Sequence, residues 1–456
     1  MRKFIVFLLL FLCLLNCCPT AMAEESITAN CSGLQATHAL GSTEDHSCNA
    51  AAAILYELDT KTMAFSINPD AVMDPSGLVK LMSLLVAVEE GNAEDEVIVQ
   101  QSTLESLPDG VKKIGLQAGD HLTVRDLMYC IMLTSANDAA VVLAEHIAGS
   151  QQAFVEKMNE RAATAGCVNT SFVNAHGLQD ASQHTTARDF AIIMTAALEN
   201  ETFTEIFESV NYQLPDSLSC SQTVFTTNEM QIVGGSNYDE RVTGGKAVSA
   251  SSREHSIVCT AKTEKGRYLC IVFSVPSNYG PFSTAKKLLN YGYQSFAVQK
   301  IMEAEPAYSM FDVKNGENSV VVGPGHGVYA LLPVKYDPKS IHLVAVGDKK
   351  QLSAPISEGQ SVGTLQICYG TTVVSEVELL ARHSVLEKGT TIKAVETTGN
   401  SSIVLKVIRV IILVLLIGAL AGAGALLIMR QVNINRYQKR KKQRILRERD
   451  RANELE

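Results

Sequence analysis

Apolar residues follow two different periods along this chain, and the change of period separates segments of different expected structure. Residues 51–67 hold two largely apolar runs on either side of Asp59-Thr60-Lys61, which predicts two strands joined by a turn. After Asp74-Pro75-Ser76, a helix start, apolar residues recur every three or four positions. Helices are predicted at residues 78–90, 123–133, 138–148, 151–166 and 188–199.

From about residue 243 the pattern changes to that of strands, with apolar runs at 256–262 and 267–274 on either side of a Glu-Lys-Gly turn. Helices between an early hairpin and late strands predict an α+β domain at 49–300, with its first and last strands in one sheet. Residues 307–392 hold short apolar runs between Gly, Asp and Pro turns, which predicts a small all-β domain.

The first 23 residues have the features of a secretory signal peptide. Arg2 and Lys3 precede an apolar run, and Ala21-Met22-Ala23 supplies small residues for cleavage. A lipoprotein signal ending at Cys17 is a second interpretation, disfavoured by the bulky Asn16 before it. Residues 24–48 are then an N-terminal extension.

A second long apolar run lies near the other end of the chain. Residues 410–429 carry no charge, and a helix of that length spans about 30 Å, the thickness of a bilayer core. The prediction is a linker at 393–402, a single C-terminal transmembrane helix at 403–429 and a basic tail at 430–456. Because positive charge beside a span stays in the cytoplasm, we expect a single-pass protein of the cell membrane with its main body on the extracytoplasmic side.

Gly418 and Gly422 give the span a G-x-x-x-G spacing that suits a homodimer, although this spacing is also frequent by chance in a Gly/Ala-rich helix.

The net charge of −9 averages regions of opposite sign. Without the +2 of the signal peptide and the +6 of the tail, residues 24–429 carry −17. An acidic body argues against nucleic acid as a partner, and the basic tail is explained by membrane orientation. The hydrophobic content of 46% excludes a largely disordered chain.

Eleven cysteines are present, and none has the paired C-x-x-C spacing of a zinc site. Cys259 and Cys270 lie on the two arms of the predicted late hairpin, where either a disulfide or two buried free thiols would fit. Cys31 and Cys48 are a second pair, and the sequence does not decide between these states.

Three short polar segments are candidates for chemistry. Lys80 stands among Leu and Met, where burial without a partner is costly and desolvation would lower its pKa toward that of a usable base; the alternative is a solvated lysine on a helix edge. Ser135-Ala136-Asn137 interrupts an apolar run and alone predicts a helix cap. Gly244-Gly245-Lys246 leads into a strand and alone indicates little.

In this order and spacing the three segments resemble the serine-type D-alanyl-D-alanine carboxypeptidases, the low-molecular-mass penicillin-binding proteins of peptidase family S11. That family has S-x-x-K at a helix start, S-x-N some sixty residues later and K-T-G on a late strand. Residues 115–124, 176–178, 186–189 and 354–363 extend the similarity.

The resemblance implies a β-lactamase/transpeptidase-like domain followed by a small all-β domain and a membrane anchor, with no metal or organic cofactor. It also implies the stem peptide of peptidoglycan as partner. The family reaction is attack by a serine hydroxyl on the D-Ala-D-Ala bond, giving an acyl-enzyme that water hydrolyses.

The match to the family's catalytic residues is incomplete. By this resemblance, the sequence has the family's polar residues at Lys80 (general base), Ser135 (proton relay), Asn137 and Lys246. The sequence departs from the family at Gly77, the position of the nucleophile, and at Ala247 and Val248, the positions of Thr and Gly in K-T-G.

Ser76 is a candidate substitute nucleophile because, on an ideal helix, it shares a face with Lys80. Its hydroxyl would still lie ~100° around and ~1.5 Å along the axis from the family position, and a misplacement of about 1 Å can cost about a hundredfold in rate. Three hypotheses follow: a family protein with weak or absent catalysis, a non-catalytic peptidoglycan-binding scaffold, and an active serine hydrolase using Ser76, or Ser135 through Lys80 or Lys246.

Overall fold

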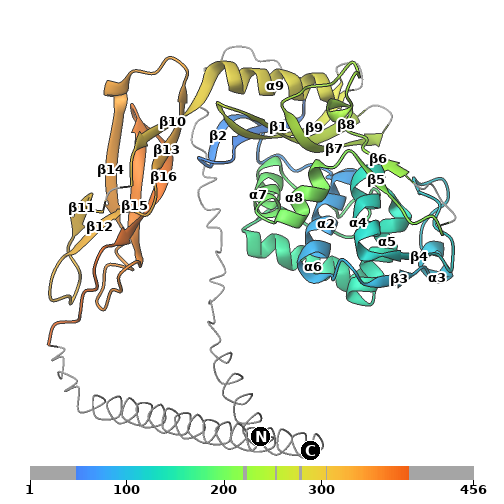
Figure 1. Cartoon of the computed structure of the whole chain (residues 1–456), viewed down its shortest axis with the longest axis horizontal. Helices are drawn as coiled ribbons and strands as arrows, with labels where there is room; N and C mark the ends of the chain where they lie inside the picture. The colour runs from blue at the N-terminus through green and yellow to red at the C-terminus, as the bar shows by residue number, and fades with distance from the viewer. Residues whose placement is uncertain (1–47, 219–222, 252–253, 277–279, 305, 390–456) are drawn as a thin grey trace, which may run out of the picture. The chain divides into compact units, whose positions relative to one another are not determined.

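The computed structural model describes residues 48–218, 223–251, 254–276, 280–304 and 306–389 (Figure 1). The predicted signal peptide, linker, transmembrane helix and basic tail, together with Gly418 and Gly422, therefore lie outside the described residues. None of the helices within those ranges combines the length and hydropathy that a membrane span requires.

One antiparallel sheet joins the two ends of the first domain, as the sequence predicts. Its strands run in the order β2-β1-β9-β8-β7. The bounds are β1 Ala52–Glu57, β2 Thr62–Ile67, β7 Val242–Ser251, β8 Glu254–Thr263 and β9 Gly266–Pro276. Strand β7 is consequently an edge of the sheet, and its outer side faces the helical part of the domain.

Alternation along the strands places a separate core on each face of the sheet. Ala52 and Ile54 of β1 join one core, which includes α7 (Ala187–Leu198), whereas Ala53 and Leu55 join the other, beneath α9 (Pro281–Ser295). Figure 1 shows the sheet between α9 on one face and the remaining helices of the domain on the other.

Helices α2, α5, α6 and α7 lie where the sequence predicts them. The bounds of the remaining helices are α2 Val79–Glu90, α3 Gln101–Glu105, α4 Val124–Tyr129, α5 Asn137–Ala148, α6 Gln151–Ala165 and α8 Glu201–Glu208. The predicted helix at 123–133 differs, because α4 ends at Tyr129 and the chain continues to Thr134 as a π-helix, η3 (Cys130–Thr134). Thr123 and Asp126 begin α4 with a reciprocal capping box. The periodicity did not predict α3, α8 or α9.

The predicted all-β region forms its own sheet, with strand order β11-β12-β16-β15-β14, and a separate pair, β10-β13. The bounds are β10 Phe296–Met302, β11 Ser309–Phe311, β12 Val320–Pro324, β13 Val328–Pro333, β14 Ile341–Gly347, β15 Ser361–Tyr369 and β16 Thr372–Ala381. Buried valine and leucine residues such as Val322, Leu365 and Leu379 form its core. The expectation of a β domain after an α+β domain is confirmed.

The late hairpin places Cys259 of β8 directly opposite Cys270 of β9. Both side chains are fully buried and both thiols are free, so the structure has the second of the two states left open by the sequence. Cys48 packs against the same core as a third free thiol, and Cys31 lies outside the described residues.

Candidate active site

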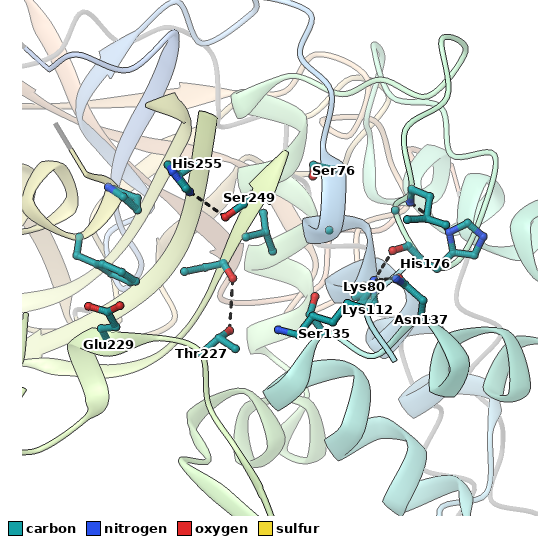
Figure 2. A pocket seen from close by; sticks show the side chains of 17 residues that line it. Ser76, Lys80, Lys112, Ser135, Asn137, His176, Thr227, Glu229, Ser249 and His255 are labelled. Carbon is teal, nitrogen blue, oxygen red and sulfur yellow. Dashed lines mark hydrogen bonds between the residues drawn. The ribbon is translucent and has the colours of Figure 1, made fainter. Parts of the chain in front are cut away.

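A cleft of about 500 Å³ brings together residues from three distant parts of the sequence. It lies where the edge strand β7 meets the start of α2 and the turn before α5 (Figure 2). Its lining includes Ser76, Gly77, Lys80, Ser135, Asn137, Ala247 and Val248, and Lys246 lies beneath the lining. The structure thus assembles every predicted site residue in one place.

Lys80 is held inside the protein by two oxygen atoms. Its Nζ donates to Oδ1 of Asn137 at 2.7 Å and to the carbonyl of His176. The side chain is only 2% exposed, which excludes the solvated alternative. Desolvation, with the charge of Lys112, lowers the pKa of Lys80 to about 7, while Asp138 acts in the opposite direction. At that pKa half of the amines are neutral near pH 7, as a general base requires.

Ser135 is presented to the cleft by a break in helical structure. The π-helix η3 ends at Thr134, Ser135 takes a left-handed conformation with φ 61°, and α5 begins at Asn137. Left-handed backbone is disfavoured for a residue with a side chain and is found most often where surrounding structure holds a functional group in place. The S-x-N segment is therefore a sharp corner. The polar helix cap predicted from the sequence is wrong, because the N-cap residue of α5 is Ala136 and no side chain caps the helix.

Lys246 fixes β7 to the end of this π-helix. Its Nζ donates to the carbonyls of Ile131 at 2.9 Å and Met132 at 2.8 Å, which lie in the last helical turn and so lack helical partners. Desolvation, followed by the charges of Lys80 and Lys112, lowers the pKa of Lys246 well below its ordinary value. Gly245 precedes it because a Cβ there would lie 2.5 Å from Nδ2 of Asn228.

Gly77 occupies the position that faces both Ser135 and β7. A Cβ atom on residue 77 would lie 3.5 Å from Oγ of Ser135 and 3.1 Å from Cγ1 of Val248. A hydroxyl carried by that Cβ would consequently reach the serine that resembles the family's proton relay. With glycine there, residue 77 presents no nucleophile.

Ser76 does not occupy an equivalent position. It lies in a 3₁₀ turn, η2 (Ser76–Leu78), with φ 49°, and its backbone N–H donates to Asp74 Oδ1 at 2.8 Å. The expectation that Ser76 and Lys80 share a helix face assumed α-helical geometry from residue 76, whereas α2 begins at Val79. In Figure 2 the Ser76 hydroxyl lies above the start of the helix, away from Lys80 and Ser135.

The turn at residues 176–178 contacts the backbone of Ser76 and requires a glycine. Gly177 has φ 70°, and a Cβ there would lie 2.1 Å from the carbonyl oxygen of Ser76. The neighbouring carbonyl of His176 accepts from Lys80, and burial with the Lys80 charge lowers the pKa of His176 to about 4. The 176–178 turn, which the sequence indicated only by resemblance, is therefore part of the wall of the cleft.

Reasoning from the sequence missed other lining residues because they belong to no motif. They are Lys112, Thr227, Glu229, Ser249, His255, Pro281 and Phe282. Within the described ranges, no group of three or more His, Cys, Asp or Glu side chains is arranged to hold a metal ion.

Comparisons with known proteins match both domains. A sequence model described as D-alanyl-D-alanine carboxypeptidase matches residues 39–277, and one for the penicillin-binding protein 5 C-terminal domain matches residues 296–396. The D-alanyl-D-alanine carboxypeptidase DacF of Bacillus subtilis is 24% identical over 392 residues, which are 85% of this chain and 96% of the relative. The carboxypeptidase DacA of Haemophilus influenzae is 29% identical over 349 residues, 74% of this chain and 85% of the relative.

Solved structures give the same result. Penicillin-binding protein 5 from Haemophilus influenzae superposes with a TM-score of 0.62 at 27% identity, covering 74% of this chain and 98% of that protein. A penicillin-binding protein 3 from Streptococcus pneumoniae shares the fold with a TM-score of 0.59 at 22% identity, covering 74% and 99%.

Proposed function

The chain belongs to the D-alanyl-D-alanine carboxypeptidase family of peptidoglycan metabolism, the low-molecular-mass penicillin-binding proteins of family S11, and on that premise we propose that it binds D-Ala-D-Ala stem peptides with weak or absent acyl transfer. The proposal has two parts: loss of the attacking group, and retention of the groups that would hold a peptide.

The loss of attack rests on one observation, the relation of residue 77 to Ser135. A Cβ at residue 77 would lie 3.5 Å from Oγ of Ser135, and this position is occupied by glycine. Acyl transfer by this family needs a hydroxyl that forms a covalent bond to the carbonyl carbon. Ser76 and Ser135 both line the cleft, and the hydrogen bonds of Lys80 go to Asn137 and His176 and not to Ser76.

Retained peptide binding is supported by the polar groups around Gly77, where the side chain of a nucleophile is missing. Lys80 and Asn137, joined by a hydrogen bond, line the cleft together with Ser135, and the cleft has a volume of about 500 Å³. A pocket of this size with few polar groups is ordinary for a peptide or small-molecule ligand. A chain that had lost both functions would have no reason to keep two buried lysines, each of which is costly to bury.

The location of the protein is part of the proposal and rests on the sequence. The signal peptide at 1–23, the apolar segment at 403–429 and the basic tail support an extracytoplasmic body on a single span, with the tail in the cytoplasm. Peptidoglycan is then the accessible partner, and a homodimer through Gly418 and Gly422 would form within the membrane. Protease treatment of intact cells should degrade the body and leave an epitope at the C-terminus protected.

Labelling with a fluorescent penicillin tests the loss of acyl transfer. The full-length protein, purified in detergent, should remain unlabelled, as should Ser76→Ala. If the native protein is labelled and Ser76→Ala abolishes this, the chain is a serine hydrolase and the proposal is wrong. Isothermal titration with a synthetic D-Ala-D-Ala pentapeptide tests the second part, because a protein that binds none of it has no peptide-holding role.

A further inference from the structure

Lys112 is a cation at the cleft that none of the described residues neutralises. It lines the cleft on the side of Lys80 and Asn137 (Figure 2). Within the described part of the chain its ammonium group has neither a hydrogen-bond acceptor nor an ion-pair partner. The adjacent Lys113 is also exposed but does not line the cleft.

The backbone that carries Lys112 is firmly held. The carboxylate of Asp138, which is fully buried, accepts from the N–H groups of Ile114 at 3.1 Å, Gly115 at 2.9 Å and Leu116 at 3.1 Å. The carbonyl of Lys112 itself accepts from the N–H of Asn137 at 3.0 Å. Lys112 is thus positioned by the segment that supplies Ser135 and Asn137, and a group fixed in this way loses less entropy on binding than a lysine on a free loop.

The other charged groups of the cleft leave Lys112 as the cation available to a ligand. Lys80 and Lys246 donate to protein oxygens and are almost completely buried. Glu229, the acidic residue in the lining, lies across the cleft (Figure 2) and accepts from Nδ2 of Asn237 at 2.6 Å. Partial burial lowers the pKa of Lys112, and its charge in turn lowers those of Lys80 and Lys246. An anion beside Lys112 would offset the repulsion between its charge and those of Lys80 and Lys246.

We propose that Lys112 binds a carboxylate of the peptide other than its C-terminal one, so that the cleft prefers D-Ala-D-Ala peptides that carry a free side-chain carboxylate. This inference rests on the proposed function. The C-terminus of a bound peptide would lie along β7, by Ala247 and Val248, whereas Lys112 is on the opposite wall. Lys112 is also exposed at the mouth, while the family's polar positions lie deeper. A residue upstream of the C-terminus is therefore the part of the ligand within its reach.

The test uses two synthetic D-Ala-D-Ala pentapeptides that differ only in whether one side-chain carboxylate is free or amidated. Each is titrated into the full-length protein in detergent at pH 8 and low salt, for the native protein, Lys112→Gln and Lys113→Gln. A charge-assisted contact in a partly desolvated site should give the native protein about a tenfold preference for the free carboxylate. Lys112→Gln should reduce this to near onefold, and Lys113→Gln should retain it.

The outcomes distinguish a failure of this inference from a failure of the proposed function on which it rests. If the native protein binds both peptides equally, or if Lys112→Gln keeps the preference, the inference is overturned while peptide binding stands. If neither peptide binds the native protein, the proposed function fails and the inference fails with it. Added salt should weaken the preference of the native protein, because screening acts on the Lys112 contact.

Discussion

Cγ1 of Val248 lies 3.1 Å from where the Cβ of a side chain on Gly77 would stand. The two departures from the family pattern, far apart in sequence, are therefore in contact across the cleft. One removes the side chain that would carry the nucleophile, and the other places a branched side chain against the vacated position. Restoring a hydroxyl at residue 77 without changing Val248 would crowd it, because close-packed side chains leave little room for an added group.

We expect that Gly77→Ser alone does not restore acylation, whereas Gly77→Ser combined with Ala247→Thr and Val248→Gly does. The triple variant carries a hydroxyl on a Cβ that would lie 3.5 Å from Oγ of Ser135, a group that the native chain lacks. It also removes the contact with Val248. Fluorescent penicillin labelling should be faster in the triple variant than in Gly77→Ser by roughly a hundredfold, the cost of a misplaced reacting group.

The matched control is the double variant Ala247→Thr with Val248→Gly, which widens the cleft but has no hydroxyl at residue 77. It should remain unlabelled. Labelling of this control would show that another group attacks, and equal labelling of the single and triple variants would show that Val248 does not obstruct residue 77.

Burial of Lys80 should make stability depend on pH. Its pKa is about 7 in the folded protein and 10.5 when exposed, so between these values the unfolded chain binds a proton that the folded chain does not. The free energy of unfolding therefore increases with pH across this window and is lowest, as far as Lys80 is concerned, below pH 7. The native protein should gain about 2 kcal/mol over Lys80→Met between pH 7 and pH 9 in urea unfolding.

The lysine at position 113 supplies the comparison for this measurement, because it is exposed and does not line the cleft. Lys113→Met should follow the native protein at every pH. A difference between native and Lys80→Met that stays constant from pH 7 to pH 9 would contradict a lowered Lys80 pKa in the folded state.

The fold was predictable from the sequence wherever one period dominates a segment. The β1–β2 hairpin, the β8–β9 hairpin and helix α2 follow from apolar runs between turn residues or from helical spacing. The π-helix η3 was not predictable, because its apolar residues are those of an ordinary helix. Lys246, over a hundred residues away in the sequence, donates to the carbonyls of Ile131 and Met132 in this π-helix, and hydrophobic spacing does not indicate that contact.

The candidate site was predictable only where a motif marks it. Lys80, Ser135 and Lys246 lie in the three polar segments that the sequence singles out, the resemblance assigns their roles, and the structure brings them together. Lys112 precedes the recognisable 115–124 stretch and has no pattern of its own, so its place in the cleft depends on the fold around Asp138. The geometry of Ser76 was misjudged because a left-handed residue at a helix start leaves no trace in hydrophobic spacing.

Asp138→Asn should destabilise the protein and loosen the segment that carries Lys112. The buried carboxylate accepts from four backbone N–H groups, the fourth being that of Ala139 at 3.0 Å. An amide offers one acceptor oxygen and turns an NH₂ toward other donors, which leaves buried groups unsatisfied at about 1–3 kcal/mol. Thermal unfolding measures the loss, and hydrogen exchange at residues 114–116 should become faster.

Asp180→Asn is the control for this change, because Asp180 is exposed and accepts from a single backbone N–H, that of Ser182 at 2.8 Å. We expect its effect to stay within about 0.5 kcal/mol. Unchanged stability in Asp138→Asn would mean that the four N–H groups are satisfied by something other than this carboxylate.

The thiols of Cys259 and Cys270 should react with an alkylating reagent only when the protein unfolds. They face each other across β8 and β9 and both are fully buried. The hydrogen bond with Cys259, together with burial, raises the pKa of Cys270. Alkylation needs an accessible thiolate, so both conditions oppose reaction in the folded state. Cys368, a half-buried free thiol in the β domain, serves as the internal comparison.

Iodoacetamide treatment of the native protein followed by peptide mapping should modify Cys368 and leave Cys259 and Cys270 intact. In denaturant without reductant, all three should be modified, because the structure has them as free thiols. If Cys259 and Cys270 become reactive in denaturant only after a reductant is added, they form a disulfide in the purified protein. The directly opposed register of the two strands would then be the geometry that allows this bond.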